Sequence, residues 1–175
     1  MKKVRKSWMA LVMGALLLGT LVGVVWARPH DRPQAADITR KVTMTGDEFI
    51  VRADGYNWFS NGTYVECSSG ACMFFAPVVF PCLPSVTVER VKLHVADSHG
   101  TATARAELHR AHPSTADNIY LGEAASPPGT AGFQTFTSPA INKRVWPSQR
   151  AHIYLAISGP NIRVYGVTVE YHRNI

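Results

Sequence analysis

The chain has 175 residues and a formal net charge of +6, from 18 basic and 12 acidic residues. Four of the basic residues lie within the first six positions, so the rest of the chain holds 14 basic and 12 acidic residues, spread without runs. Binding to nucleic acid needs a basic patch or stripe, and this distribution offers none, so we expect no nucleic-acid partner.

The N-terminal segment is typical of a secretory signal peptide. It begins with a basic stretch, and from Trp8 to Ala27 it carries no charge and is strongly apolar. A small residue closing such a run marks the cleavage site. Ala27 is the expected position, with Ala35 or Ala36 as a second candidate. The alternative is a retained membrane anchor, because about 20 apolar residues can span a bilayer.

We therefore expect residues 1–27 to be a signal peptide and the protein to be secreted or held in the cell envelope. Contact with a membrane is expected only if this segment is retained. Residues 28–38 are polar and contain proline, which is typical of a flexible lead-in. Residues 39–175 are then long enough to form a single domain with its own core.

Alternation of apolar and polar residues with a period of two dominates this domain and predicts strands. Segments 48–53, 62–67 and 72–80 are the first clear candidates. Pro77 confines the third of these to a sheet edge or a bulge. Weaker strand candidates are 41–44, 118–124 and 132–138.

Two pairs of segments show the alternation most clearly. Segments 88–97 and 101–110 are joined by the turn-like residues 97–100, which predicts a hairpin that is buried on one side. Segments 150–158 and 162–172 are joined by residues 158–161 and predict a second hairpin.

In the last segment, alternation places four side chains on one face: Tyr165, Val167, Val169 and Tyr171. Gly166 predicts a β-bulge or the close approach of another backbone.

Many short strands with turns between them favour an all-β fold, an antiparallel two-sheet β-sandwich of jelly-roll-like form. A closed barrel is the alternative. The sequence resembles a family of uncharacterised exported bacterial proteins. The shared features, in order, are a hydrophobic-proline strand, a long hairpin with a small-residue tip and a closing strand of the type LRLxGVxIxY. The resemblance spans about residues 74–171 and implies a jelly-roll-like β-sandwich, with no catalytic residue to carry over. Some members place Cys where Tyr165 stands.

The cysteines Cys67, Cys72 and Cys82 lie close together in the sequence. In an exported protein this predicts a disulfide with one thiol left over. Cys67 and Cys72 flank a turn-like stretch and are the candidate pair. Pairing of Cys67 with Cys82 and three free thiols both stay open. The paired CxxC spacing of structural zinc is absent, and we expect neither metal nor cofactor.

No motif predicts catalysis. A G-x-S-x-G nucleophile motif is missing from the sequence. The glutamates that could supply paired carboxylates for glycoside cleavage show no pattern that marks a pair: Glu66, Glu89, Glu107 and Glu123. We therefore expect no catalytic residue.

Three histidines fall opposite the apolar stripes of their own strands and are interpreted as surface residues: His94, His109 and His152. The alternative is a patch on adjacent strands that could bind a metal or an acidic group. This patch would contain His94, Arg105, Glu107 and His109.

Segment 54–64 concentrates aromatic residues among Asn, Ser and Gly. Aromatic rings with polar groups beside them suit stacking on sugars and adaptable protein contacts. The alternative is that Asn61 and Gly62 form a hairpin turn while Trp58 and Phe59 fold into the core. Trp146, before a proline, is a second exposed aromatic. The candidate ligand-binding residues are Tyr56, Trp58, Asn61 and Trp146.

We thus expect a non-catalytic exported binding domain whose target is a surface polysaccharide or an envelope or extracellular protein. The first alternative is a self-associating structural protein, a homo-oligomer formed through an apolar strand such as 72–80. The second is an exported hydrolase, which would need a carboxylate pair or a histidine cluster to converge in a cleft.

Overall fold

A computed structural model describes residues 39–52, 57–81, 85–98, 101–115, 117–129 and 131–174. The expected signal peptide with its cleavage site at Ala27, the lead-in, Tyr56 and Cys82 lie outside the described residues. Within this part of the chain, the only helix is the short 3-10 turn η1 (Gly46–Glu48). None of the helical segments found there is long and apolar enough to cross a bilayer.

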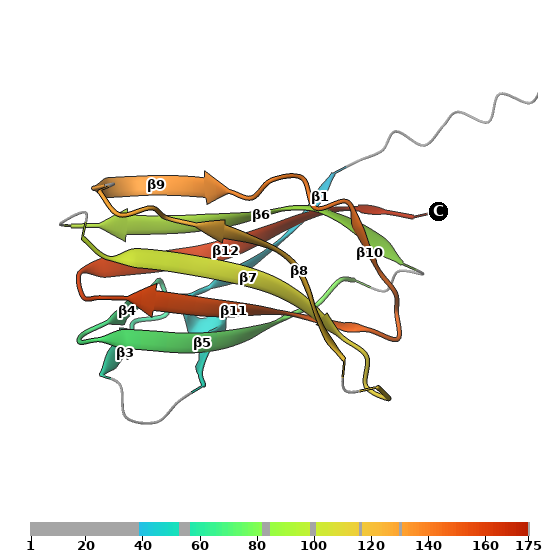
Figure 1. The fold of residues 1–175 in the computed structure, drawn as a ribbon, viewed down its shortest axis with the longest axis horizontal. Helices are drawn as coiled ribbons and strands as arrows, with labels where there is room; N and C mark the ends of the chain where they lie inside the picture. The colour runs from blue at the N-terminus through green and yellow to red at the C-terminus, as the bar shows by residue number, and fades with distance from the viewer. Residues whose placement is uncertain are drawn as a thin grey trace, which may run out of the picture. The chain divides into compact units, whose positions relative to one another are not determined.

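Strands form two antiparallel sheets, which confirms the predicted all-β sandwich (Figure 1). One sheet has seven strands, in the order β10-β6-β12-β4-β3, with β1 also beside β12 and β9 also beside β6. The other has five strands, in the order β2-β5-β11-β7-β8. In chain order the strands are β1 (Arg40–Thr45), β2 (Ile50–Val51), β3 (Trp58–Ser60), β4 (Val65–Cys67), β5 (Ala71–Val78), β6 (Val86–Asp97), β7 (Thr103–Ala111), β8 (Asn118–Ala125), β9 (Gly132–Thr137), β10 (Lys143–Val145), β11 (Arg150–Ser158) and β12 (Ile162–Arg173).

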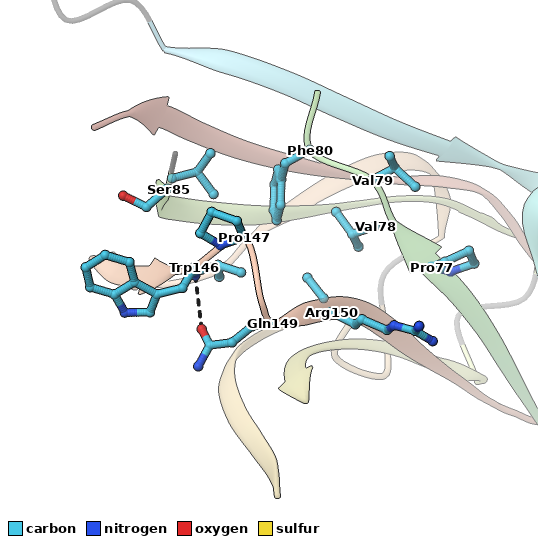
Figure 2. Close-up of a pocket in the computed structure, with 12 residues that line it drawn as sticks. Pro77, Val78, Val79, Phe80, Ser85, Trp146, Pro147, Gln149 and Arg150 are labelled. Carbon is cyan, nitrogen blue, oxygen red and sulfur yellow. Dashed lines mark hydrogen bonds between the residues drawn. The ribbon is translucent and has the colours of Figure 1, made fainter. Parts of the chain in front are cut away.

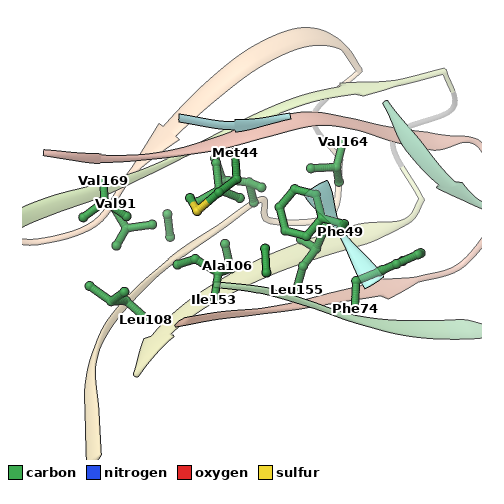
Figure 3. Close-up of a cluster of buried hydrophobic side chains, with 14 of the residues drawn as sticks. Met44, Phe49, Phe74, Val91, Ala106, Leu108, Ile153, Leu155, Val164 and Val169 are labelled. Atoms are coloured by element: carbon green, nitrogen blue, oxygen red, sulfur yellow. The ribbon is translucent and has the colours of Figure 1, made fainter. Parts of the chain in front are cut away.

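The core lies between the two sheets and is built from the apolar side of each alternating strand. Val91 of β6 and Val169 of β12 face Leu108 of β7 and Ile153 of β11, and all four are fully buried (Figure 3). Each such side chain contributes on the order of 2 kcal/mol by leaving water.

The two predicted hairpins are wrong, although their strands are right. β6 belongs to the seven-stranded sheet and β7 to the five-stranded sheet, and β12 and β11 are divided in the same way. The chain therefore passes from one sheet to the other between β6 and β7 and again between β11 and β12, instead of turning back beside itself. The apolar side of a strand is buried whether the next strand pairs with it in the same sheet or packs against it from the opposite sheet. Alternation alone therefore does not distinguish a hairpin from a connection between sheets.

The β-bulge expected at Gly166 is confirmed. Val164 pairs with Val95 and Gly166 with His94, which leaves Tyr165 as the extra residue in β12. A Cβ on Gly166 would lie 2.6 Å from the carbonyl oxygen of Met44, so another backbone also approaches closely.

The bulge changes which residues of β12 face the core. Val164 before it and Val167 after it are both fully buried, so the alternation shifts by one residue. Tyr165 is only half-buried and contacts side chains on the outer face. The expectation that Tyr165 shares a face with Val167 is therefore wrong, because the extra residue reverses the phase.

Pro77 lies at an open stretch of β5, as its missing N–H requires. The short β2 pairs only with Phe74 and Phe75 of β5. Opposite Pro77, β5 pairs with β11 through His152. Among the described residues no strand lies on the other side of Pro77, which confirms the predicted edge position.

Candidate functional site

The hairpin β3–β4 is closed by the predicted Asn-Gly turn. The side-chain oxygen of Asn61 accepts hydrogen bonds from the backbone N–H groups of Thr63, at 3.0 Å, and Tyr64, at 3.2 Å. Gly62 has a φ of +82°, which suits glycine. Asn61 thus holds the shape of this turn, and its part in binding a ligand remains a prediction.

The disulfide joins Cys67 of β4 to Cys72 of β5, which confirms the candidate pair. Because β4 and β5 belong to different sheets, this bond connects the two sheets at one end of the sandwich. Trp58 lies directly opposite Cys67 and packs edge-on against Phe74, with ring centroids 6.0 Å apart. Trp58 and Phe59 are 44% and 50% exposed, so the alternative that both fold into the core is wrong.

Four aromatic side chains form a continuous line on the outer face of the seven-stranded sheet, and we call this line the aromatic row. It contains Phe59 of β3, Tyr64 before β4, Tyr165 of β12 and Phe133 of β9. Ring centroids are 6.0 Å apart between Phe59 and Tyr64, 5.5 Å between Tyr64 and Tyr165, and 5.4 Å between Tyr165 and Phe133. The two end members are at least half exposed. The row thus offers ring faces to solvent across neighbouring strands.

Arg163 lies beside the row and is held in place on two sides. Its Nε donates to the carboxylate of Glu66, directly opposite on β4, at 2.9 Å. Its guanidinium carbon lies 4.8 Å from the ring centroid of Tyr64, within the range of a cation–π interaction. The pKa of Arg163 is raised, chiefly by the hydrogen bond to Glu66. Arg163 is therefore a fixed cation within the row.

Next to the row, a chain of polar side chains crosses the same face. His94 bonds through one ring nitrogen to Thr135 at 2.9 Å and through the other to Thr168 at 3.0 Å. Thr168 in turn bonds to Thr43 at 2.9 Å. Burial, with a further contribution from Lys92, lowers the pKa of His94. A neutral imidazole and three hydroxyl groups therefore line the centre of this face.

A cluster of cations lies at the other end of the face. Lys92 and Lys41 approach the same carboxylate oxygen of Glu170, at 2.7 and 3.5 Å. Arg90 stands directly opposite Glu170 on β6. The hydrogen bond from Lys92 is the main cause of the lowered pKa of Glu170, which stays ionised. Beside this cluster lies a hollow of about 480 Å³, lined by Thr39, Lys41, Glu89, Arg90, Ala140, Asn142 and Glu170.

Trp146 lies at a separate pocket of about 300 Å³ near the start of β11 (Figure 2). Its indole is 48% exposed, and the guanidinium carbon of Arg144 lies over it, 4.8 Å from a ring centroid. Gln149 accepts a hydrogen bond from the backbone N–H of Trp146. In Figure 2 the indole points away from Phe80, so it borders the pocket and does not fill it. β10 and β3 lie at opposite ends of the sandwich (Figure 1), so Trp146 and Trp58 do not form one site.

The expected histidine patch is divided between the two sheets. His94 lies on β6, whereas Glu107 and His109 lie on β7 in the five-stranded sheet, where His109 bonds to Glu107 at 3.0 Å and Arg105 pairs with Glu107 at 2.8 Å. The interpretation of His152 as a surface residue is wrong, because it is only 7% exposed. The described residues contain no group of three or more metal-ligating side chains that could hold a metal.

Sequence reasoning missed three members of the face, namely Phe133, Arg163 and Tyr165. The bulge at Gly166 was the signal that could have placed Tyr165 outside, since an extra residue reverses the alternation. Phe133 and Arg163 become neighbours of Tyr165 only through the pairing of β9, β6 and β12.

No protein-family model and no curated protein matches this chain. Solved structures do match: CsCBM6-3 from Clostridium stercorarium, in complex with cellobiose, is 15% identical over 72% of this chain and 90% of that chain, with a TM-score of 0.45. The carbohydrate-binding module CBM36, in complex with calcium and xylotriose, is 14% identical over 74% and 98%, with a TM-score of 0.45. The low-affinity xylan-binding module CBM86 from Roseburia intestinalis is 15% identical over 75% and 96%, with a TM-score of 0.43. Identities and TM-scores this low do not identify a ligand for this chain, so the ligand has to be inferred from its own residues.

Proposed function

We propose that this chain is a non-catalytic, exported domain that binds a polysaccharide on the cell surface or outside the cell. The aromatic row is the observation that carries this proposal. Aromatic faces stack on the C–H faces of sugar rings, which water solvates poorly, and polar groups beside the rings can bond to sugar hydroxyls. The outer face of the seven-stranded sheet supplies both.

The dimensions of the row suit a chain of sugars better than a single small molecule. Phe59 and Phe133 stand on β3 and β9, with β4, β12 and β6 between them. The ring centroids of these two end members are at most about 17 Å apart, the total of the three successive spacings along the row. An extended glycan lying along it would contact several rings in succession while its hydroxyl groups reach Arg163 and the hydroxyl group of Thr135.

The state of the carboxylates on this face favours binding over catalysis. Glu66 is bonded to Arg163, and Glu170 is bonded to Lys92. General acid and nucleophile roles in glycoside cleavage need two carboxyl groups facing the same bond. Glu66 and Glu170 are instead each turned to a cation, and Glu89, which lines the hollow beside Glu170, bonds to His172 and Thr39.

Trp58, Asn61 and Trp146 remain candidates for further contacts. Asn61 belongs to the same hairpin as Phe59, so a ligand that extends past the end of the row would reach it. Trp58 points to the opposite side of β3 from Phe59, toward Phe74, so a ligand would contact it only around the edge of the sheet. Trp146 would need a separate ligand segment.

The test is binding of the full chain to a panel of immobilised and soluble polysaccharides, by affinity electrophoresis and calorimetry. Tyr165→Ala and Phe133→Ala should each weaken binding at least about tenfold, equivalent to about 1.4 kcal/mol, because each removes a ring from the row. The control is Tyr120→Ala, a half-exposed ring on β8 of the other sheet.

Circular dichroism would establish that each variant keeps its sheets. Phe133 is 63% exposed, so its removal leaves the core intact even if Tyr165→Ala disturbs the bulge. If the two row variants bind every glycan as the unaltered chain does, the proposal is wrong. A loss in Tyr120→Ala alone would move the site to the five-stranded sheet.

A further inference from the structure

We infer that the polysaccharide bound by this face is acidic, carrying carboxylate or sulfate groups on its sugar units. This inference rests on the proposed function and names the class of glycan. Its basis is the arrangement of charges around the aromatic row.

In two ion pairs of this face the cation is more exposed than its carboxylate partner. The side chain of Arg163 is 46% exposed and that of its partner Glu66 only 21%. The side chain of Lys41 is 61% exposed, whereas Glu170 below it is 11% exposed. A ligand approaching the face therefore meets positive charge first, although several opposite charges are present.

Arg163 is oriented for an anion at the row itself. The bond to Glu66 uses Nε, and among the described residues no group is bonded to the two terminal nitrogens. A guanidinium can bind a carboxylate or sulfate through two parallel N–H donors. Stacking on Tyr64 holds the plane of the guanidinium in place before a ligand arrives. A charged sugar seated on Tyr64 would thus find a prepared partner.

A second group of cations lies further along β12. Lys41 and Lys92 contact the carboxylate of Glu170, Arg90 stands opposite Glu170, and Glu89 lines the same hollow. Three cations against two carboxylates leave this group with excess positive charge. Arg163 and Glu170 are seven positions apart along β12, about 23 Å at the rise of an extended strand. The polar chain around His94 lies between them and carries no negative charge. The aromatic row runs across the strands and this second group lies along β12. A chain that follows the row would therefore meet Arg163, and a branch or second segment of the polysaccharide would meet the second group.

A second exposed Arg–Glu pair, on the other sheet, provides a control for attraction to net charge alone. Arg105 on the five-stranded sheet pairs with Glu107 at 2.8 Å and its side chain is 53% exposed, much like Arg163 with Glu66. Arg105→Gln removes the same charge from the molecule without touching the row. It should leave binding to acidic glycans unchanged.

The experiment measures binding of the full chain to polygalacturonate, to dextran sulfate and to neutral dextran over a range of salt concentrations. We expect at least about tenfold tighter binding to one of the acidic polymers than to dextran, weakening as salt rises because the charges are exposed. Which acidic polymer binds tighter tells carboxylate from sulfate recognition. Arg163→Gln and Lys41→Gln should each weaken that binding at least about threefold.

Equal binding of neutral and acidic polymers would overturn the inference. So would an equal loss in Arg163→Gln and Arg105→Gln, which would indicate attraction to net charge alone. In both cases a loss of glycan binding in Tyr165→Ala would still support the row as the binding site. If Tyr165→Ala binds all glycans normally, the proposed function itself fails, and the inference fails with it.

Discussion

His152 makes the stability of this domain sensitive to mild acid. Its ring is covered by Tyr154, Phe75 and His109, with ring centroids 4.8, 5.1 and 5.7 Å away. Burial lowers the pKa of His152 from 6.5 to about 4, and His109 and Arg52 add to this. The folded protein therefore keeps this imidazole neutral at pH values where the unfolded chain protonates it.

The direction and size of the effect follow from this difference in proton binding. Between pH 6.5 and about 4, the unfolded state binds a proton at His152 that the native state does not. The free energy of unfolding should then fall by about 1.4 kcal/mol per pH unit, up to about 3 kcal/mol by pH 4. Above pH 6.5 neither state is protonated and the contribution of His152 to the pH dependence vanishes.

Urea unfolding followed by tryptophan fluorescence between about pH 7 and pH 4 would measure this loss. His152→Gln removes the titrating group, so the stability of the unaltered chain relative to this variant should decline by up to about 3 kcal/mol over that range. His112→Gln, in the turn after β7, should retain the full decline because His152 is still present. Parallel stability curves for the unaltered chain and His152→Gln would refute the reasoning.

Two further predictions concern the ends and centre of the sandwich. Replacing Cys67 and Cys72 together by Ser should lower the free energy of unfolding by about 2 kcal/mol, the chain entropy that closing so short a loop removes; a reductant that leaves the melting temperature of the unaltered chain unchanged would contradict this. Gly166→Ala should cost about 1–3 kcal/mol in thermal unfolding, because the new methyl meets the backbone oxygen of Met44 at 2.6 Å. A Gly166→Ala variant that unfolds at the same temperature as the unaltered chain would contradict the close approach of the Met44 backbone.

Features that depend on local sequence could be predicted. Alternation located the strands, the Asn61–Gly62 pair marked its turn, and short spacing identified the Cys67–Cys72 disulfide. Gly166 marked a bulge because few other residues tolerate such close backbone approach. Each of these signals is contained within a few neighbouring residues.

The partners of the strands could not be predicted, and the candidate site depends on them. Phe59, Tyr64, Phe133 and Tyr165 are spread over more than a hundred positions, and only strand register brings them together. Segment 54–64 pointed to two of the four. Tyr165 was assigned to the same face as Val167 because simple alternation was assumed through the bulge. The extra residue reverses the alternation, so Tyr165 and Val167 point to opposite faces.

The placement of the last two strands has a consequence for how the domain assembles. β12 lies between β6 on one side and β1 and β4 on the other, and β11 lies between β5 and β7. Each sheet is thus completed around a strand from the final part of the chain, and the strands that pair most extensively are far apart in sequence. Such non-local pairing makes folding slow. Until residues 150–173 are present, apolar strands such as β5 and β6 lack their main partners, which leaves an incomplete chain exposed to aggregation.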